Sequence, residues 1–79
     1  FNSSAVLEGV YKIGKDIPAG EYKLVATEAG NDGYYAVLSS SYNYGDNIVA
    51  NDNFSNNAYI TVQDGQYLQI SRALGEKVD

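Results

Sequence analysis

One short motif recurs along this chain and limits the folds that it can adopt. Glycine, any residue and tyrosine follow one another four times, and a fifth copy has asparagine in place of glycine. Glycine and asparagine tolerate the positive φ at the end of a tight turn, and tyrosine favours strands. Each copy therefore predicts the start of a β-strand. The copies are Gly9-Val10-Tyr11, Gly20-Glu21-Tyr22, Gly33-Tyr34-Tyr35, Asn57-Ala58-Tyr59 and Gly65-Gln66-Tyr67.

The spacing of these starts is typical of a small all-β fold. A further short extended run lies between the third and fourth copies, and when it is counted the strand starts lie about 9 to 13 residues apart. No stretch places apolar residues at helical spacing for more than about two turns. The sequence therefore predicts an antiparallel β-sandwich or flattened barrel of six or seven short strands. The expected strands cover residues 10–13, 21–27, 34–40, 47–50, 58–63 and 66–73.

Alternation within the runs predicts which side chains form the core, because residues two apart share one face of a strand. In the second and third runs a tyrosine lies on the apolar face, whereas in the last two runs it lies on the polar face. We therefore expect Tyr59 and Tyr67 to be partly exposed. The core face is assigned to Tyr22, Leu24, Ala26, Tyr35, Val37, Ile60, Val62, Leu68 and Ile70.

The segment between the last two runs predicts a β-hairpin. A two-residue loop would place each apolar residue opposite a polar one, whereas the three-residue loop 63–65 restores matching faces. Such a loop ends in a bulge that requires positive φ at Gly65. Tyr59 and Tyr67 then become diagonal neighbours on the outer face. The expected pairs are Val62 with Gln66, Ile60 with Leu68, Ala58 with Ile70, Thr61 with Tyr67, and Tyr59 with Gln69.

The connections and the ends differ in composition. Pro18 predicts a structured corner over residues 15–20. Residues 51–56 are rich in Asn and Asp and are predicted to form a loop, with Phe54 as its apolar anchor. The alternation stops after Ala73, and we expect residues 74–79 to fray.

The chain has 79 residues, which suffice for one β domain over residues 1–79, with an ordered core at about residues 8–73. It contains no Cys and no His, so no disulfide forms and only oxygen ligands could hold a metal. It begins at Phe1 and has no Met, which indicates a segment excised from or processed out of a larger secreted protein.

Charge and residue types exclude several classes of function. A net charge of −5 without a basic patch repels nucleic acid, and no apolar run is long enough for membrane insertion. Without His or Cys, no Ser-His or Cys-His pair can form, and no phosphate-binding loop or dinucleotide fingerprint is present. Carboxylate pairs for sugar hydrolysis are conceivable, but ten acidic residues are expected as solvated surface in an acidic domain. We expect no enzyme and no cofactor.

Clustered oxygen-bearing side chains leave weak calcium binding as an open alternative. Their spacing does not match an EF-hand loop, and no bidentate Glu closes the set. Asn and Asp in loops more often bond their own backbone, so we predict turns and no metal site. The residues concerned are Asp46, Asn47, Asn51, Asp52, Asn53 and Asn56.

Tyrosines outside the assigned core are the best candidates for binding, because exposed Tyr stacks on sugar rings and anchors protein interfaces. The alternative is that they close the ends of the sandwich. Two functions therefore remain. The first is a non-catalytic surface module that binds carbohydrate, cell-wall polymer or another surface protein. The second is a structural spacer or a self-association domain that pairs by a strand edge. The candidates are Tyr34, Tyr42, Tyr44, Tyr59 and Tyr67.

Three segments carry a resemblance to a known family, and they read YKIGKDIPAGEYKL (11–24), ANDNF (50–54) and AYITVQDGQYL (58–68). Over residues 11–73 the chain resembles small all-β modules of secreted proteins and lipoproteins in Gram-positive bacteria. The shared residues are turn and strand residues, so the resemblance implies no catalytic or binding residue. It implies an extracellular or cell-surface location, often beside other domains.

Overall fold

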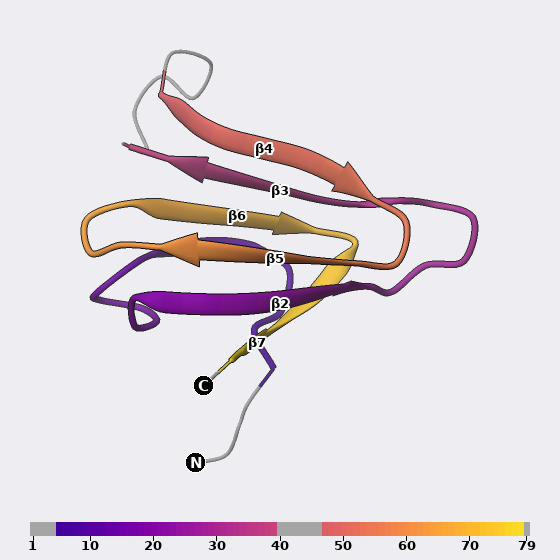
Figure 1. Cartoon of the computed structure of the whole chain (residues 1–79), viewed down its shortest axis with the longest axis horizontal. Helices are drawn as coiled ribbons and strands as arrows, with labels where there is room; N and C mark the ends of the chain where they lie inside the picture. The colour runs from indigo at the N-terminus through magenta and orange to yellow at the C-terminus, as the bar shows by residue number, and fades with distance from the viewer. Residues whose placement is uncertain (1–4, 40–46, 79) are drawn as a thin grey trace.

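Two antiparallel sheets form a β-sandwich, as predicted, and do not close into a barrel (Figure 1). The computed structural model describes residues 5–39 and 47–78. The four-stranded sheet has the order β1-β6-β3-β4 and the three-stranded sheet the order β5-β2-β7. The strands are β1 (Gly9–Lys12), β2 (Gly20–Ala26), β3 (Gly33–Leu38), β4 (Ile48–Phe54), β5 (Asn57–Val62), β6 (Tyr67–Ser71) and β7 (Ala73–Lys77).

The repeated motif marks strand starts, as predicted. β1, β2 and β3 begin at the motif glycine, β5 begins at Asn57, and β6 begins at Tyr67. The glycines meet different needs. Gly65 has φ of 91°, a conformation that strains any other side chain. Gly33 lacks space instead, because a Cβ there would lie 2.6 Å from Cζ of Phe54.

In the first two copies, the tyrosine folds back onto the chain just before it. Tyr11 Oη donates to the Leu7 carbonyl and Tyr22 Oη to the Pro18 carbonyl, both at 2.7 Å and both four residues earlier. This arrangement is the tyrosine corner found in Greek-key sandwiches. Tyr22 is only 1% exposed, and burial raises the pKa of its hydroxyl above the ordinary 10.0 because the phenolate would be desolvated.

The core lies between the two sheets and confirms the alternation. Of the residues assigned to the core face, all are buried except Ala26 and Tyr35, which are half-buried and pack against the core. Ile13, Phe54 and Ala73 complete it. The predicted exposure of Tyr59 and Tyr67 is also confirmed, since Tyr59 is 56% exposed and Tyr67 is half-buried.

The predicted hairpin between β5 and β6 is wrong. β5 pairs with β2, whereas β6 pairs with β1 and β3. The turn 63–66 therefore carries the chain from one sheet to the other, with Gln66 N donating to Gln63 O at 3.1 Å. The positive φ predicted at Gly65 is confirmed. Apolar side chains of β5 and β6 face each other across the core. Apolar and polar residues alternate along both strands in this arrangement as they would in a hairpin, so the sequence pattern does not distinguish the two.

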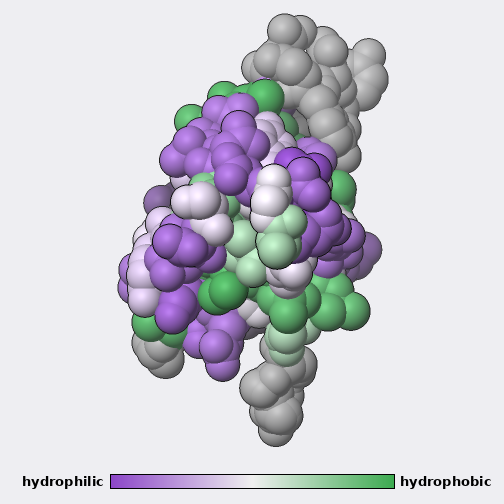
Figure 2. Space-filling model, turned by 90° about the vertical axis from the view of Figure 1, so that its right-hand side faces the viewer, coloured by the Kyte–Doolittle hydropathy of each residue, from purple (hydrophilic) through white to green (hydrophobic). Residues whose placement is uncertain are grey.

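The predicted final run divides at Arg72, which has φ of 53°. Residues beyond Ala73 form β7 because they pair with β2, so the expected fraying is wrong. Arg72 Nε donates to Asp32 O at 2.7 Å, and Arg72 N donates to the Glu8 carboxylate. These bonds lie at the end of the sandwich that also carries the β2–β3 connection, where hydrophilic side chains cover much of the surface (Figure 2).

The predicted loop over residues 51–56 is also wrong in part, because residues 51–54 belong to β4 and pair with β3. Phe54 points inward and is buried, but the rest of β4 is exposed. The four-stranded sheet extends beyond β5 on this side, so none of the described strands covers the inner side of β4 (Figure 1). The other expected strand ends agree with the structure within two residues.

Candidate binding site

The structure separates the candidate tyrosines. Tyr34 and Tyr67 lie on the outer face of the four-stranded sheet, whereas Tyr59 lies on the outer face of the other sheet. The two faces are on opposite sides of the sandwich, so the expected contact between Tyr59 and Tyr67 is wrong. The crossing turn 63–66 is the reason, because it sends the two strands into different sheets. Tyr42 and Tyr44 lie outside the described residues.

The outer face of the four-stranded sheet combines aromatic and amide side chains. Tyr67 pairs with Leu38, four residues along β3 from Tyr34, which separates the two tyrosines by about 13 Å along the strands. Ala36 lies between these two positions on β3 and pairs with Gln69 of β6 on one side and with Asn51 of β4 on the other. We call this the amide–aromatic face. Its polar and aromatic side chains are Lys12, Tyr34, Asn51, Asn53, Tyr67, Gln69 and Ser71, and the exposed Val10 lies beside Gln69 on the same face.

Polar contacts orient both rings of the amide–aromatic face. Asn51 Nδ2 donates to Tyr34 Oη at 3.1 Å. Lys12 Nζ lies 5.9 Å from the ring centroid of Tyr67, within the range of a cation–π contact. None of the strand residues on this face is acidic, although the chain carries a net charge of −5. The face therefore offers two rings and several amides to an uncharged or anionic ligand.

The opposite face has a different character. Lys23 lies between Tyr59 and Glu76 in the ladder, with its Nζ 6.0 Å from the Tyr59 ring centroid. In the next row Val25 pairs with Leu74, and both are partly exposed. The strands of this face therefore present a single ring and charges of both signs, whereas those of the amide–aromatic face present two rings, several amides and no acidic residue.

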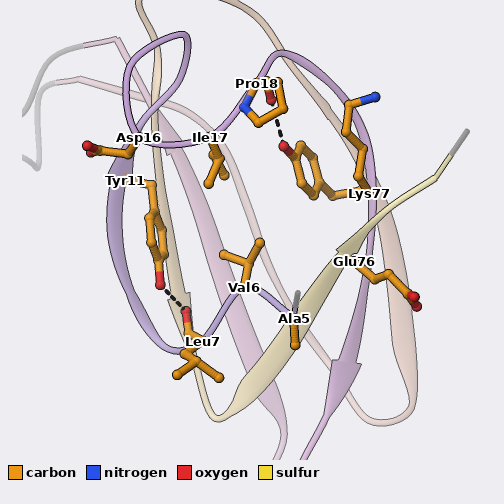
Figure 3. A pocket seen from close by; sticks show the side chains of 10 residues that line it. Ala5, Val6, Leu7, Tyr11, Asp16, Ile17, Pro18, Glu76 and Lys77 are labelled. Carbon is orange, nitrogen blue, oxygen red and sulfur yellow. Dashed lines mark hydrogen bonds between the residues drawn. The ribbon is translucent and has the colours of Figure 1, made fainter. Parts of the chain in front are cut away.

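A groove of about 770 Å³ opens on one side of the sandwich (Figure 3). The segment before β1 forms part of it, held to β7 by Val6 N to Gly75 O at 2.7 Å and Gly75 N to Val6 O at 2.9 Å. Val6 and Ile17 lie at its centre, and the charged end of Asp16 points away (Figure 3). Sequence reasoning missed this groove, because it depends on how the N-terminal segment packs. Its lining is Ala5, Val6, Leu7, Tyr11, Asp16, Ile17, Pro18, Tyr22, Glu76 and Lys77.

The two tyrosine corners leave this groove poor in polar groups for a ligand. The hydroxyls of Tyr11 and Tyr22 are already engaged with the Leu7 and Pro18 carbonyls. A specific small-molecule site combines an apolar lining with a few convergent polar groups. The groove has the first feature, while its tyrosine hydroxyls serve the fold.

The Asn and Asp residues considered for calcium point in different directions. Asp52 Oδ1 accepts from Asn53 N at 2.9 Å, while Asn51 donates across the sheet to Tyr34. Asp46 lies outside the described residues. Within residues 5–39 and 47–78, no three acidic side chains gather where they could hold a metal ion. The same residues include no helix with the length and hydrophobicity to cross a bilayer.

Fold and surface together define a small two-sheet β-sandwich with an amide–aromatic outer face on its larger sheet. Comparison with family models then identifies the class, because the model of the Rv1352-like extracellular domain matches residues 3–70. The chain belongs to this family of extracellular domains, which confirms the predicted extracellular or cell-surface location. No curated protein and no solved structure matched the chain significantly.

Proposed function

We propose that this extracellular domain is a non-catalytic binding module that holds carbohydrate, such as a cell-wall polymer, on the amide–aromatic face. One observation carries the proposal: Tyr34 and Tyr67 lie on one sheet face with amide side chains between them and no carboxylate among the described strand residues. Aromatic rings stack on the apolar faces of sugars, and amides both donate to and accept from hydroxyls.

The span between the two rings favours a polymer over a single sugar. Tyr34 and Tyr67 lie about 13 Å apart along the strands, a distance longer than one sugar ring. The face crosses four strands, so an extended chain can contact both rings at once. Two weak contacts made by one polymer reinforce each other, since the second is formed at a high effective concentration.

Composition and resemblance support the remaining parts of this proposal. The absence of His and Cys removes the usual nucleophile–base pairs, which supports a role without catalysis. The segments 11–24 and 58–68 support an origin in secreted proteins or lipoproteins of Gram-positive bacteria. A cell wall rich in polysaccharide is the surface that such a module would meet.

Affinity electrophoresis in gels that contain soluble cell-wall polysaccharide tests this function. We expect Tyr34→Ala and Tyr67→Ala each to weaken retardation about tenfold, which corresponds to about 1.4 kcal/mol of binding free energy. Tyr59→Ala is the matched control, because Tyr59 is exposed on the opposite face. Binding that survives both changes, or that is lost only with Tyr59→Ala, would exclude the amide–aromatic face. Failure to bind any polymer on a glycan array would favour the spacer or self-association role instead.

A further inference from the structure

Four strands lie at the edges of the two sheets: β1, β4, β5 and β7. An open edge presents unpaired N–H and C=O groups to other chains, and natural proteins usually block it. β1 is blocked at its C-terminal end, because Lys12 N donates to Asp16 Oδ2 and Lys12 O accepts from Asp16 N, both at 2.8 Å. β7 is blocked because Val6 and Gly75 exchange two backbone hydrogen bonds.

The edge of β4 is also protected, by three devices. The β3–β4 register shifts between Val37 and Leu38, which distorts the strand as a bulge does. Asn53 N is occupied by Asp52 Oδ1 at 2.9 Å. Asp52 pairs with Tyr35, which packs against the core, so the carboxylate lies on the inner side of the sheet. An inward-pointing charge on an edge strand discourages pairing with a second copy.

β5 lacks these devices. Ala26 N donates to Asn56 O at 2.9 Å, so these two residues form a hydrogen-bonded pair. Hydrogen-bonded and non-hydrogen-bonded pairs then alternate along the β2–β5 ladder. Ala58 and Ile60 then bond to β2, while the N–H groups of Asn57, Tyr59 and Thr61 point away from the sheet. Within the described residues no recorded hydrogen bond reaches those three groups.

The composition of β5 also suits strand addition. The strand contains no charged residue and no proline over its six residues. Its outward side chains Tyr59 and Thr61 are exposed, and β-branched or aromatic residues favour cross-strand pairing. Among the residues that the structure describes, the side-chain cap nearest to this edge lies beyond the end of the strand, where Gln66 Oε1 accepts from Gln63 N at 2.8 Å.

The shape of the sandwich limits what can pair with β5 to a single strand. The four-stranded sheet extends past β5, and the inner side of β4 is exposed at Ala50 and Asp52 (Figure 1). Pairing of β5 with β5 of a second copy would bring the two overhanging sheets to the same side, where they would collide. A single extended strand fits beneath the overhang and makes the smaller sheet four-stranded.

We propose that β5 accepts one extended strand from another polypeptide, with small apolar residues on its inner side and a basic residue that faces Asp52. Main-chain hydrogen bonds to Asn57, Tyr59 and Thr61 supply the affinity, as in other cases of β-augmentation. The Asp52 carboxylate and the net charge of −5 favour a basic segment over an acidic one. This surface is separate from the amide–aromatic face, so the two proposals can fail independently.

A panel of octapeptides that alternate Val or Ala with Thr, Gln and one Lys tests the proposal. We expect binding peptides to slow amide exchange at Asn57, Tyr59 and Thr61 in the whole domain, followed by NMR. Methylation of the peptide nitrogens that face β5 should weaken binding at least tenfold, whereas methylation of the other nitrogens should not. No protection at millimolar peptide, or protection that ignores which nitrogens are methylated, would overturn the proposal.

Variants of the chain make the test specific. Thr61→Pro removes an N–H that no internal ladder bond uses and should abolish binding, whereas Thr61→Val keeps the N–H and should not. Replacing the peptide Lys by Glu should weaken binding to the native chain, and Asp52→Asn should abolish that difference. If Thr61→Pro does not fold, the methylated peptides still decide the question. Sedimentation of the domain alone tests for a dimer. If a dimer forms and the same three amides are protected from exchange in it, the proposal is overturned in favour of self-association.

Discussion

The same motif has opposite outcomes at the two ends of this chain. At the starts of β1 and β2 the motif tyrosine points inward and bonds a carbonyl four residues earlier, whereas at β5 and β6 it points to solvent. In β2 the tyrosine position has the same parity as the core residues, and in β5 it has the opposite parity. The motif therefore determines where a strand begins, while parity determines what its tyrosine does.

Truncation of one tyrosine from each group tests this comparison most strongly. We expect Tyr22→Ala to lower the free energy of unfolding by about 3–5 kcal/mol, as for other buried aromatic residues. Tyr59→Ala should lower it by less than about 0.5 kcal/mol, because the side chain is exposed. Urea denaturation measured by circular dichroism provides both values. Similar losses in the two variants would show that the assignment of inner and outer faces is wrong.

The motif glycines differ in the same way and can be tested as a pair. Gly33→Ala should cost about 1–3 kcal/mol, because the new Cβ would meet the Phe54 ring. Gly65→Ala should cost about 1 kcal/mol through its positive φ alone, since no described residue apart from its two chain neighbours comes within 4 Å of a Cβ there.

A second substitution separates the two causes. Phe54→Leu shortens the side chain that opposes residue 33, so it should reduce the additional cost of Gly33→Ala in the double variant. It should leave the cost of Gly65→Ala unchanged. Equal rescue of both glycine variants would contradict the steric origin of the first.

Removal of the corner hydrogen bond alone should have a smaller effect. Tyr22→Phe loses the bond to the Pro18 carbonyl and should cost about 1 kcal/mol at neutral pH. The raised pKa of Tyr22 adds a pH dependence: stability is complete below the ordinary pKa of 10.0 and falls as pH rises through the folded-state pKa. Urea midpoints on either side of pH 10.0 measure it. An equal alkaline loss in Tyr22→Phe would assign the effect to other groups.

The smallest expected effect is the coupling between Tyr59 and Tyr67. The two residues lie in different sheets on opposite faces, so the effects of Tyr59→Ser and Tyr67→Ser should add within about 0.3–0.5 kcal/mol. A hairpin would have made them neighbours with a larger coupling energy. A double-mutant cycle in urea measures this coupling energy. A clear departure from additivity would support the hairpin between β5 and β6.

The division of the last predicted run at Arg72 could have been detected in the sequence. Leu68 and Ile70 are two residues apart on the core face, but the next inward residue, Ala73, is three further along. This change of phase marks the bend at Arg72 and the start of a new strand. The extension of β4 over residues 51–54 had no such signal, because its polar residues are exposed on both sides of an overhanging strand.

The sequence by itself determined the starts of five strands, β1, β2, β3, β5 and β6, and the inner faces of the last four of these, since turn chemistry and alternation act over a few residues. Those local rules predicted the positive φ at Gly65 and the exposure of Tyr59 and Tyr67. Only the tertiary structure decided that the turn at Gly65 crosses between sheets, that the candidate tyrosines divide between two faces, and that β5 keeps an open edge. Apolar and polar residues alternate in the same way whether two successive strands belong to one sheet or to two facing sheets. Which of these forms depends on pairing between strands that are far apart in the sequence.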